Sequence, residues 1–400
     1  MAGCRYNHGR SGRDCNVLFS RVLQGHFQLL KGFASMSKKE RESGIELFRI
    51  LCMLFVICCH FQMHAHLSNP STLTGMIGCV GYMGGSAGNL GFICISAYYL
   101  DTFRFRFHKF ANLFFKASLY SAAAILIGVA FFQMNYSVGQ IVAYAFPLFF
   151  EKYGYLSAYM AIFWLSPALK VILERMPRRT HKCLCVVSTV FFTILPVATL
   201  GNYPFSNLLS VFLYCIIVIN YLKKYHPSII NNQGLMAVSS LLSWICLIGV
   251  EETFLYLRNN NILALNLTGH FTRVYSLPII FAMGTMFFCF HNLKLKSNNL
   301  INAIAGTTLG IYILHEAPAT CDLIWDAIFS PQDWGQSPFF AIKMIGAVIF
   351  VFMTCMLIEL FIQFILRQYR KIIPQCSYWK RLCHKIDTFM ESEQTSAPPA

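Results

Sequence analysis

Charged residues are scarce in this chain. Only 12% of its 400 residues are Asp, Glu, Lys or Arg, whereas 56% are hydrophobic. Because soluble domains carry roughly 25% charged residues, this composition excludes an ordinary soluble protein and predicts an integral membrane protein. The apolar runs have the length of membrane helices, about 20 residues, and do not alternate over short segments. We therefore expect an all-α helical bundle and not a β-barrel.

Acidic residues and paired cysteines are also in short supply. The chain has 17 acidic and 32 basic residues, which gives a formal net charge of +15. The basic residues lie between the apolar runs, so they indicate orientation in a membrane and not nucleic-acid binding. The 16 cysteines include no CxxC spacing. We interpret them as buried apolar residues and expect no metal site, with the Cys58–Cys59 and Cys183/Cys185 pairs as weak candidates.

Ten apolar segments predict ten transmembrane helices. The Lys and Arg residues between them are concentrated on alternate sides, which predicts that both chain termini are cytoplasmic. The run 138–150 is too short to span a membrane, so we expect it to be interfacial or re-entrant. The predicted spans are 47–66, 76–100, 110–133, 154–173, 183–200, 206–222, 235–257, 273–290, 301–316 and 339–366.

The two ends of the chain differ from its apolar middle. Residues 1–40 predict an N-terminal extension, and Met36 is placed like a start just before the first membrane helix. Residues 41–370 then form the membrane domain. The segment 371–400 is rich in polar residues and ends in Ser, Gln, Thr and Pro, so we expect a largely disordered cytoplasmic tail.

The first predicted helix carries three ionisable residues inside an apolar run, namely Glu46, Arg49 and His60. At about 100° per residue, all three lie on one stripe of the helix. His60 then lies about 16 Å along the axis from Arg49, near the middle of the membrane. Ionisable groups at that depth are costly and indicate a functional site.

Four sequence phrases resemble the acyltransferase-3 family of membrane O-acyltransferases. They occur in that family's order and spacing over roughly residues 40–370. Two positions depart from the family pattern, because Ala97 replaces a usual glycine and Gly154 stands where tryptophan is common. The four phrases are Ile45–Arg49 with His60, Phe92–Leu100, Tyr153–Tyr159 and Gly310–His315.

This resemblance implies an enzyme of the cytoplasmic membrane that takes an acyl group, usually acetyl, from acyl-coenzyme A. The acceptor is a hydroxyl of an extracytoplasmic or lipid-linked glycan. His60 would act as the base or as an acyl relay, since a sugar hydroxyl is a poor nucleophile. Arg49 would bind the donor, oriented by Glu46 one turn earlier.

Further residues complete the expected site. The anionic coenzyme A needs basic groups on the cytoplasmic side, and these are Arg104, Arg106 and Lys109. Substrate contacts are expected from Tyr159, His315 and Glu316, and Glu316 could instead pair with His64. Glu359 and Lys343 receive no role beyond pairing between helices.

Two alternatives remain open at this stage. A transporter or flippase for lipid-linked sugars would also place ionisable residues inside a bundle, although no inverted repeat is visible. The segment 317–338 holds Asp322, Trp325, Asp326 and Trp334. These residues suit either sugar contact or an interfacial aromatic belt.

Overall fold

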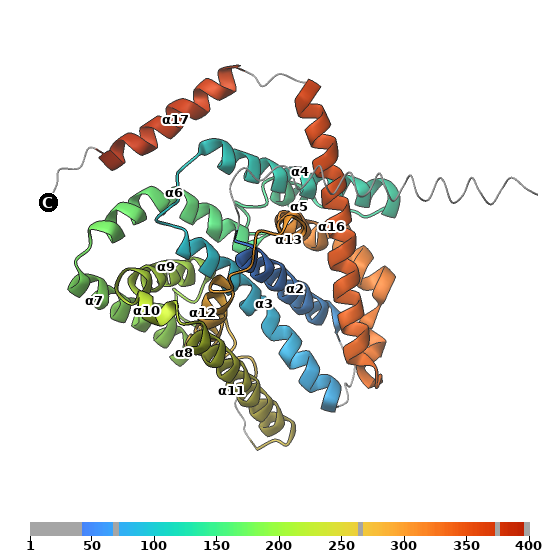
Figure 1. The fold of residues 1–400 in the computed structure, drawn as a ribbon. Coiled ribbons are helices and arrows are strands. Elements are labelled where there is room, and N and C mark those ends of the chain that lie inside the picture. The colour runs from blue at the N-terminus through green and yellow to red at the C-terminus, as the bar shows by residue number, and fades with distance from the viewer. Residues whose placement is uncertain (1–41, 67–71, 263–266, 373–376, 396–400) are drawn as a thin grey trace, which may run out of the picture.

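The computed structural model describes residues 42–66, 72–262, 267–372 and 377–395, and over these ranges it is entirely helical (Figure 1). The all-α prediction is therefore confirmed for the described residues. The predicted N-terminal extension lies outside them. The elements are α2 (Ser43–Ala65), α3 (Thr72–Tyr98), α4 (Phe107–Phe132), α5 (Val138–Ala145), α6 (Gly154–Arg175), α7 (Arg178–Thr189), η1 (Val190–Ile194), α8 (Leu195–Ala198), α9 (Leu208–Tyr225), α10 (Pro227–Ile230), α11 (Gln233–Asn259), α12 (Leu277–His291), α13 (Asn299–Ala305), α14 (Thr308–Glu316), α15 (Pro318–Asp322), η2 (Leu323–Phe329), η3 (Pro331–Gln336), α16 (Phe340–Ile372) and α17 (Ser377–Thr395).

Seven helical segments within the described ranges are long and apolar enough to cross a membrane. They are α2, α4, α6, the run Arg178–Ala198, α9, α11 and α16. Helices also occupy the other three predicted spans, but α3 is rich in glycine and α12 has only 15 residues. The third, 301–316, is divided between α13 and α14. The number of crossings and the sidedness of the termini stay predictions. The run 138–150 contains α5, whose eight residues are too few to span.

Helix α2 lies at the centre of the bundle, in contact with α3, α12, α13, α14 and α16 (Figure 1). Its approach to α3 is close because α3 presents glycines there. A Cβ atom at Gly84 would collide with the carbonyl oxygen of Phe55, and one at Gly88 with that of Cys52. Small residues at such contacts let membrane helices pack backbone to backbone. The glycines of α3 therefore allow one side of α2 to pack closely against α3. The side of α2 that carries His60 faces α14.

The α13–α14 pair brings a distant part of the chain against α2. The backbone N–H of Asn298 donates to Ser43 Oγ at 2.7 Å, which ties the start of α13 to the start of α2. The helix is interrupted at Gly306 and Thr307, and α14 then runs to Glu316. As a result, the last turn of α14 lies beside the C-terminal part of α2, where His315 contacts His60.

The segment after α14 is more buried than we expected. Trp325 in η2 has no exposed surface and packs edge-on against Phe61, with ring centroids 5.8 Å apart. Its ring is also stacked on that of His64 at 6.0 Å. Trp325 therefore belongs to the core, so neither of the two options left open for this segment, sugar contact or an interfacial belt, describes this residue.

The C-terminal segment is helical where it is described, so the prediction of a largely disordered tail was wrong for residues 377–395. Helix α17 contacts α4 and α6. Asp387 accepts a hydrogen bond at 2.6 Å from the backbone N–H of Phe107, the first residue of α4. A carboxylate at a helix N-terminus satisfies an unpaired donor and complements the helix dipole.

Replacing Asp387 by alanine should loosen α17 from α4. Since a hydrogen bond to a charged group contributes about 1.5–3 kcal/mol, we expect faster limited proteolysis within residues 377–395. The matched control is Thr388→Ala, because that hydroxyl donates only to His384 of its own helix. Equal cleavage rates for the two variants would show that Asp387 does not hold α17.

Candidate active site

Two histidines from distant parts of the chain form a hydrogen-bonded pair. Nδ1 of His60 on α2 lies 2.7 Å from Nε2 of His315 on α14, and the rings are stacked with centroids 4.9 Å apart. His315 is fully buried, and its Nδ1 lies 2.7 Å from the carbonyl oxygen of Ile311. A carbonyl oxygen only accepts, so Nδ1 of His315 carries a proton and donates it.

This arrangement determines where the proton of His60 lies. A buried imidazole is best accommodated neutral, so Nε2 of His315 is an acceptor. Nδ1 of His60 must then be the donor of the 2.7 Å bond. It follows that neutral His60 has an unprotonated Nε2, with its lone pair available for chemistry.

Glu316 supplies the negative charge of this cluster. Its Oε1 lies 3.0 Å from Nδ1 of His60 and 3.8 Å from Nε2 of His64. The pairing of Glu316 with His64 had been predicted as one option, but the shorter contact with His60 had not. A carboxylate at this distance stabilises positive charge on the imidazole ring. His60, His315 and Glu316 therefore have the arrangement of a base with its orienting partners.

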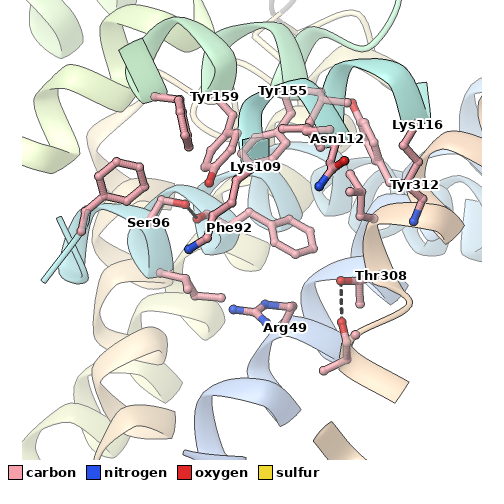
Figure 2. A pocket seen from close by; sticks show the side chains of 18 residues that line it. Arg49, Phe92, Ser96, Lys109, Asn112, Lys116, Tyr155, Tyr159, Thr308 and Tyr312 are labelled. Atoms are coloured by element: carbon pink, nitrogen blue, oxygen red, sulfur yellow. Dashed lines mark hydrogen bonds between the residues drawn. The ribbon is translucent and has the colours of Figure 1, made fainter. Parts of the chain in front are cut away.

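A cavity of about 610 Å³ lies next to the histidine pair, lined by side chains of α2, α3, α4, α6 and α14. Figure 2 shows Arg49 and Lys109 reaching into it, and Tyr155 and Tyr159 lining it from α6. The cavity and the histidines meet at Tyr312, whose ring centroid lies 6.2 Å from that of His315. Tyr312 is therefore the residue through which the cavity contacts the histidine pair.

The predicted pair of Glu46 and Arg49 is present. Arg49 NH1 donates to Glu46 Oε2 at 2.7 Å, and the Arg49 side chain keeps 26% of its surface exposed. Glu46 is buried beneath it at 8% exposure. The carboxylate holds the guanidinium in position, while the remaining N–H groups stay available to the cavity.

Of the three basic residues predicted to bind coenzyme A after the second helix, Lys109 lines the cavity together with Arg49. Lys109, Asn112 and Lys116 on α4 all line it. Their spacing of three and four residues places them on one helix face, with the two ammonium groups about two turns apart. Arg104 and Arg106 lie outside this lining, in the segment before α4. Arg104 is exposed there.

Lys116 is a cavity residue that the sequence reasoning missed. Its Nζ lies 2.5 Å from Oε1 of Glu359 on α16, whose carboxylate has no exposed surface. Tyr120 donates to the other oxygen of Glu359 at 2.7 Å, and Gln363 donates to Oε1 at 2.5 Å. The signal was available, because a lysine within the apolar part of a helix, such as Lys116 in α4, is costly without a role.

Gly310 leaves the space that Glu359 occupies. A Cβ atom at Gly310 would collide with the Glu359 carboxylate. We therefore expect Gly310→Ala to displace that side chain and to destabilise the protein by about 1–3 kcal/mol, as overpacking does. The readout is the thermal unfolding midpoint in detergent.

The control for Gly310→Ala is Gly346→Ala on α16, where an added Cβ atom meets nothing within 4 Å. In a helix this change should be neutral or slightly stabilising. If both variants unfolded at the same temperature as wild type, the close contact between Gly310 and Glu359 would be refuted.

Comparison with known protein families gives a match over most of the chain. The family model described as "Acyltransferase domain" matches residues 42–358. That range includes α2, α14, Glu316 and every residue that lines the cavity of Figure 2. No curated protein and no solved structure matches the chain.

Proposed function

This chain belongs to the acyltransferase-3 family, and on that premise we propose that it is a membrane O-acetyltransferase. It moves the acetyl group of cytoplasmic acetyl-coenzyme A to a hydroxyl of an extracytoplasmic or lipid-linked glycan. The observation that carries this proposal is the hydrogen-bonded pair of His60 and His315, with the Glu316 carboxylate 3.0 Å from His60.

The cavity has features that suit an acyl-coenzyme A donor. Its volume, about 610 Å³, is in the range of ligand sites. Arg49, Lys109 and Lys116 all line it, and coenzyme A carries phosphates that such cations recognise. With the start of α2 on the cytoplasmic side, as the basic loops predict, the donor enters near Lys109. Its acyl end then points toward Tyr312 and the histidines.

The reaction follows from the proton positions. Nε2 of His60 takes the proton of the acceptor hydroxyl while the hydroxyl oxygen attacks the thioester carbonyl carbon. The carbon–sulfur bond then breaks, and the thiolate of coenzyme A leaves with the proton returned by His60. Glu316 stabilises the transient positive charge on His60, and His315 keeps the ring in the reactive orientation. The same lone pair would serve a two-step relay through an acyl-imidazole.

The proposal is tested by following the acyl group. Membranes that contain the protein are incubated with labelled acetyl-coenzyme A, and label is measured in the glycan fraction. In parallel, cell-envelope glycans from cells with and without the protein are compared by mass spectrometry. We expect label transfer and a mass difference of one acetyl group.

The assay also separates the rival function. No label and no mass difference, with the protein present in the membrane, would refute acetyl transfer. A changed amount of glycan at the outer surface, without any acyl difference, would support a flippase instead.

A further inference from the structure

A second group of possible metal ligands shares Glu316 with the pair of His60 and His315. It consists of His64 in the last turn of α2, Glu316 at the end of α14, and Cys321 in α15. One ligand atom from each lies within 4.8 Å of the others. We propose that these three residues bind a zinc-like divalent cation at the mouth of the active site.

The distances between the ligand atoms fit a tetrahedral metal ion. Nε2 of His64 lies 3.3 Å from Sγ of Cys321 and 3.8 Å from Oε1 of Glu316. With Zn–N of about 2.0 Å and Zn–S of about 2.3 Å, tetrahedral ligands are about 3.3–3.6 Å apart. The pair of His60 and His315 differs, because its nitrogens are only 2.7 Å apart. That separation is typical of a hydrogen bond and is too short for two zinc ligands.

The donor set indicates which cation is bound. An imidazole, a thiolate and a carboxylate together favour Zn²⁺ over Mg²⁺ or Ca²⁺, which prefer oxygen ligands. On binding, the thiol of Cys321 loses its proton to water, so two anionic ligands balance the charge of the ion. Three protein ligands leave the fourth position open to water.

Neighbouring residues support the site. The ring of His64 is stacked on the buried ring of Trp325, with an interplanar angle of 7°, which fixes its orientation. Asp322 and Asp326 act electrostatically on His64 and add negative potential around the ligands. The site is thus pre-organised and attracts cations.

Metal binding would compete with the reaction. Oxygen Oε1 of Glu316 faces both His60, at 3.0 Å, and His64. A bound cation takes this oxygen and removes the partner that stabilises positive charge on His60. The site therefore makes acyl transfer sensitive to zinc. This consequence rests on the proposed function, whereas metal binding does not.

Binding is tested with Co²⁺ as a spectroscopic substitute for Zn²⁺ on purified protein in detergent. We expect one equivalent of Co²⁺ to give visible absorption with a thiolate-to-cobalt band, and Zn²⁺ to displace it. Cys321→Ser should abolish the thiolate band, and His64→Ala should weaken binding at least about tenfold. The control is Cys246→Ser, an exposed cysteine on α11, which should keep the wild-type spectrum.

Each outcome decides one claim. No cobalt band in wild type, or the same band in Cys321→Ser, overturns the metal site. If the metal binds but Zn²⁺ lowers acetyl transfer equally in wild type and Cys321→Ser, the inhibitory role is overturned. If the cobalt band forms as expected and no protein ever transfers acetyl, the proposed function fails while the metal site stands.

Discussion

Replacing His60 by alanine is expected to lower the rate of acetyl transfer by about 100- to 10 000-fold, the contribution of a positioned general base. The physical reason is the tautomer, because the unprotonated nitrogen of His60 takes no part in the bond between the two rings, whereas that of His315 accepts this bond. The measurement is label transfer from acetyl-coenzyme A at saturating donor, with the amount of protein in the membrane matched. A relay mechanism predicts the same loss.

Glu316→Gln separates the role of charge from the role of shape. Glutamine keeps the size of the side chain but cannot stabilise an imidazolium ion, so the rate should fall while the donor KM stays unchanged. His66→Asn serves as the control, since His66 is exposed and ends α2 in the left-handed conformation at φ 40°. Asparagine tolerates that conformation. Full activity of His60→Ala would refute the mechanism.

The sequence predicted what lies within single helices. The positions of Glu46, Arg49 and His60 on one stripe followed from helical periodicity, and the Glu46–Arg49 contact is present. The family resemblance came from four short phrases, and the match over residues 42–358 agrees with it. These features are local, so periodicity and spacing are sufficient to find them.

Contacts between distant helices could not be predicted in this way. His60 and His315 are 255 residues apart in the chain. They meet because α13 and α14, two helices separated by a short break, both contact α2. For that reason, His60 was predicted as the base or acyl relay and His315 separately as a substrate contact. Likewise, α17 was taken as disordered from its polar composition. Cys383 and Asp387 of α17 are buried, and α17 contacts α4 and α6. Such burial depends on helices that are distant in the sequence, so the composition of α17 alone did not predict it.

The second large effect is expected from breaking the ion pair of Lys116 and Glu359. Lys116→Met alone leaves the buried carboxylate of Glu359 without its cation. Breaking such a pair costs about 3–5 kcal/mol, so the variant should unfold at a clearly lower temperature than wild type. The double variant Lys116→Met/Glu359→Gln removes both charges, and it should recover most of the lost stability.

The double variant should regain stability, but it should not regain wild-type binding of acetyl-coenzyme A. Since Lys116 lines the cavity together with Lys109 of the same helix, we expect the acetyl-coenzyme A KM to rise about tenfold in the double variant. A matched control is Lys343→Met on α16, because that ammonium lies 5.3 Å from the Trp334 ring centroid and outside the cavity. A double variant with restored stability and a wild-type KM would show that Lys116 serves only to neutralise Glu359. A raised KM in the stable double variant would instead place the donor against this face of α4.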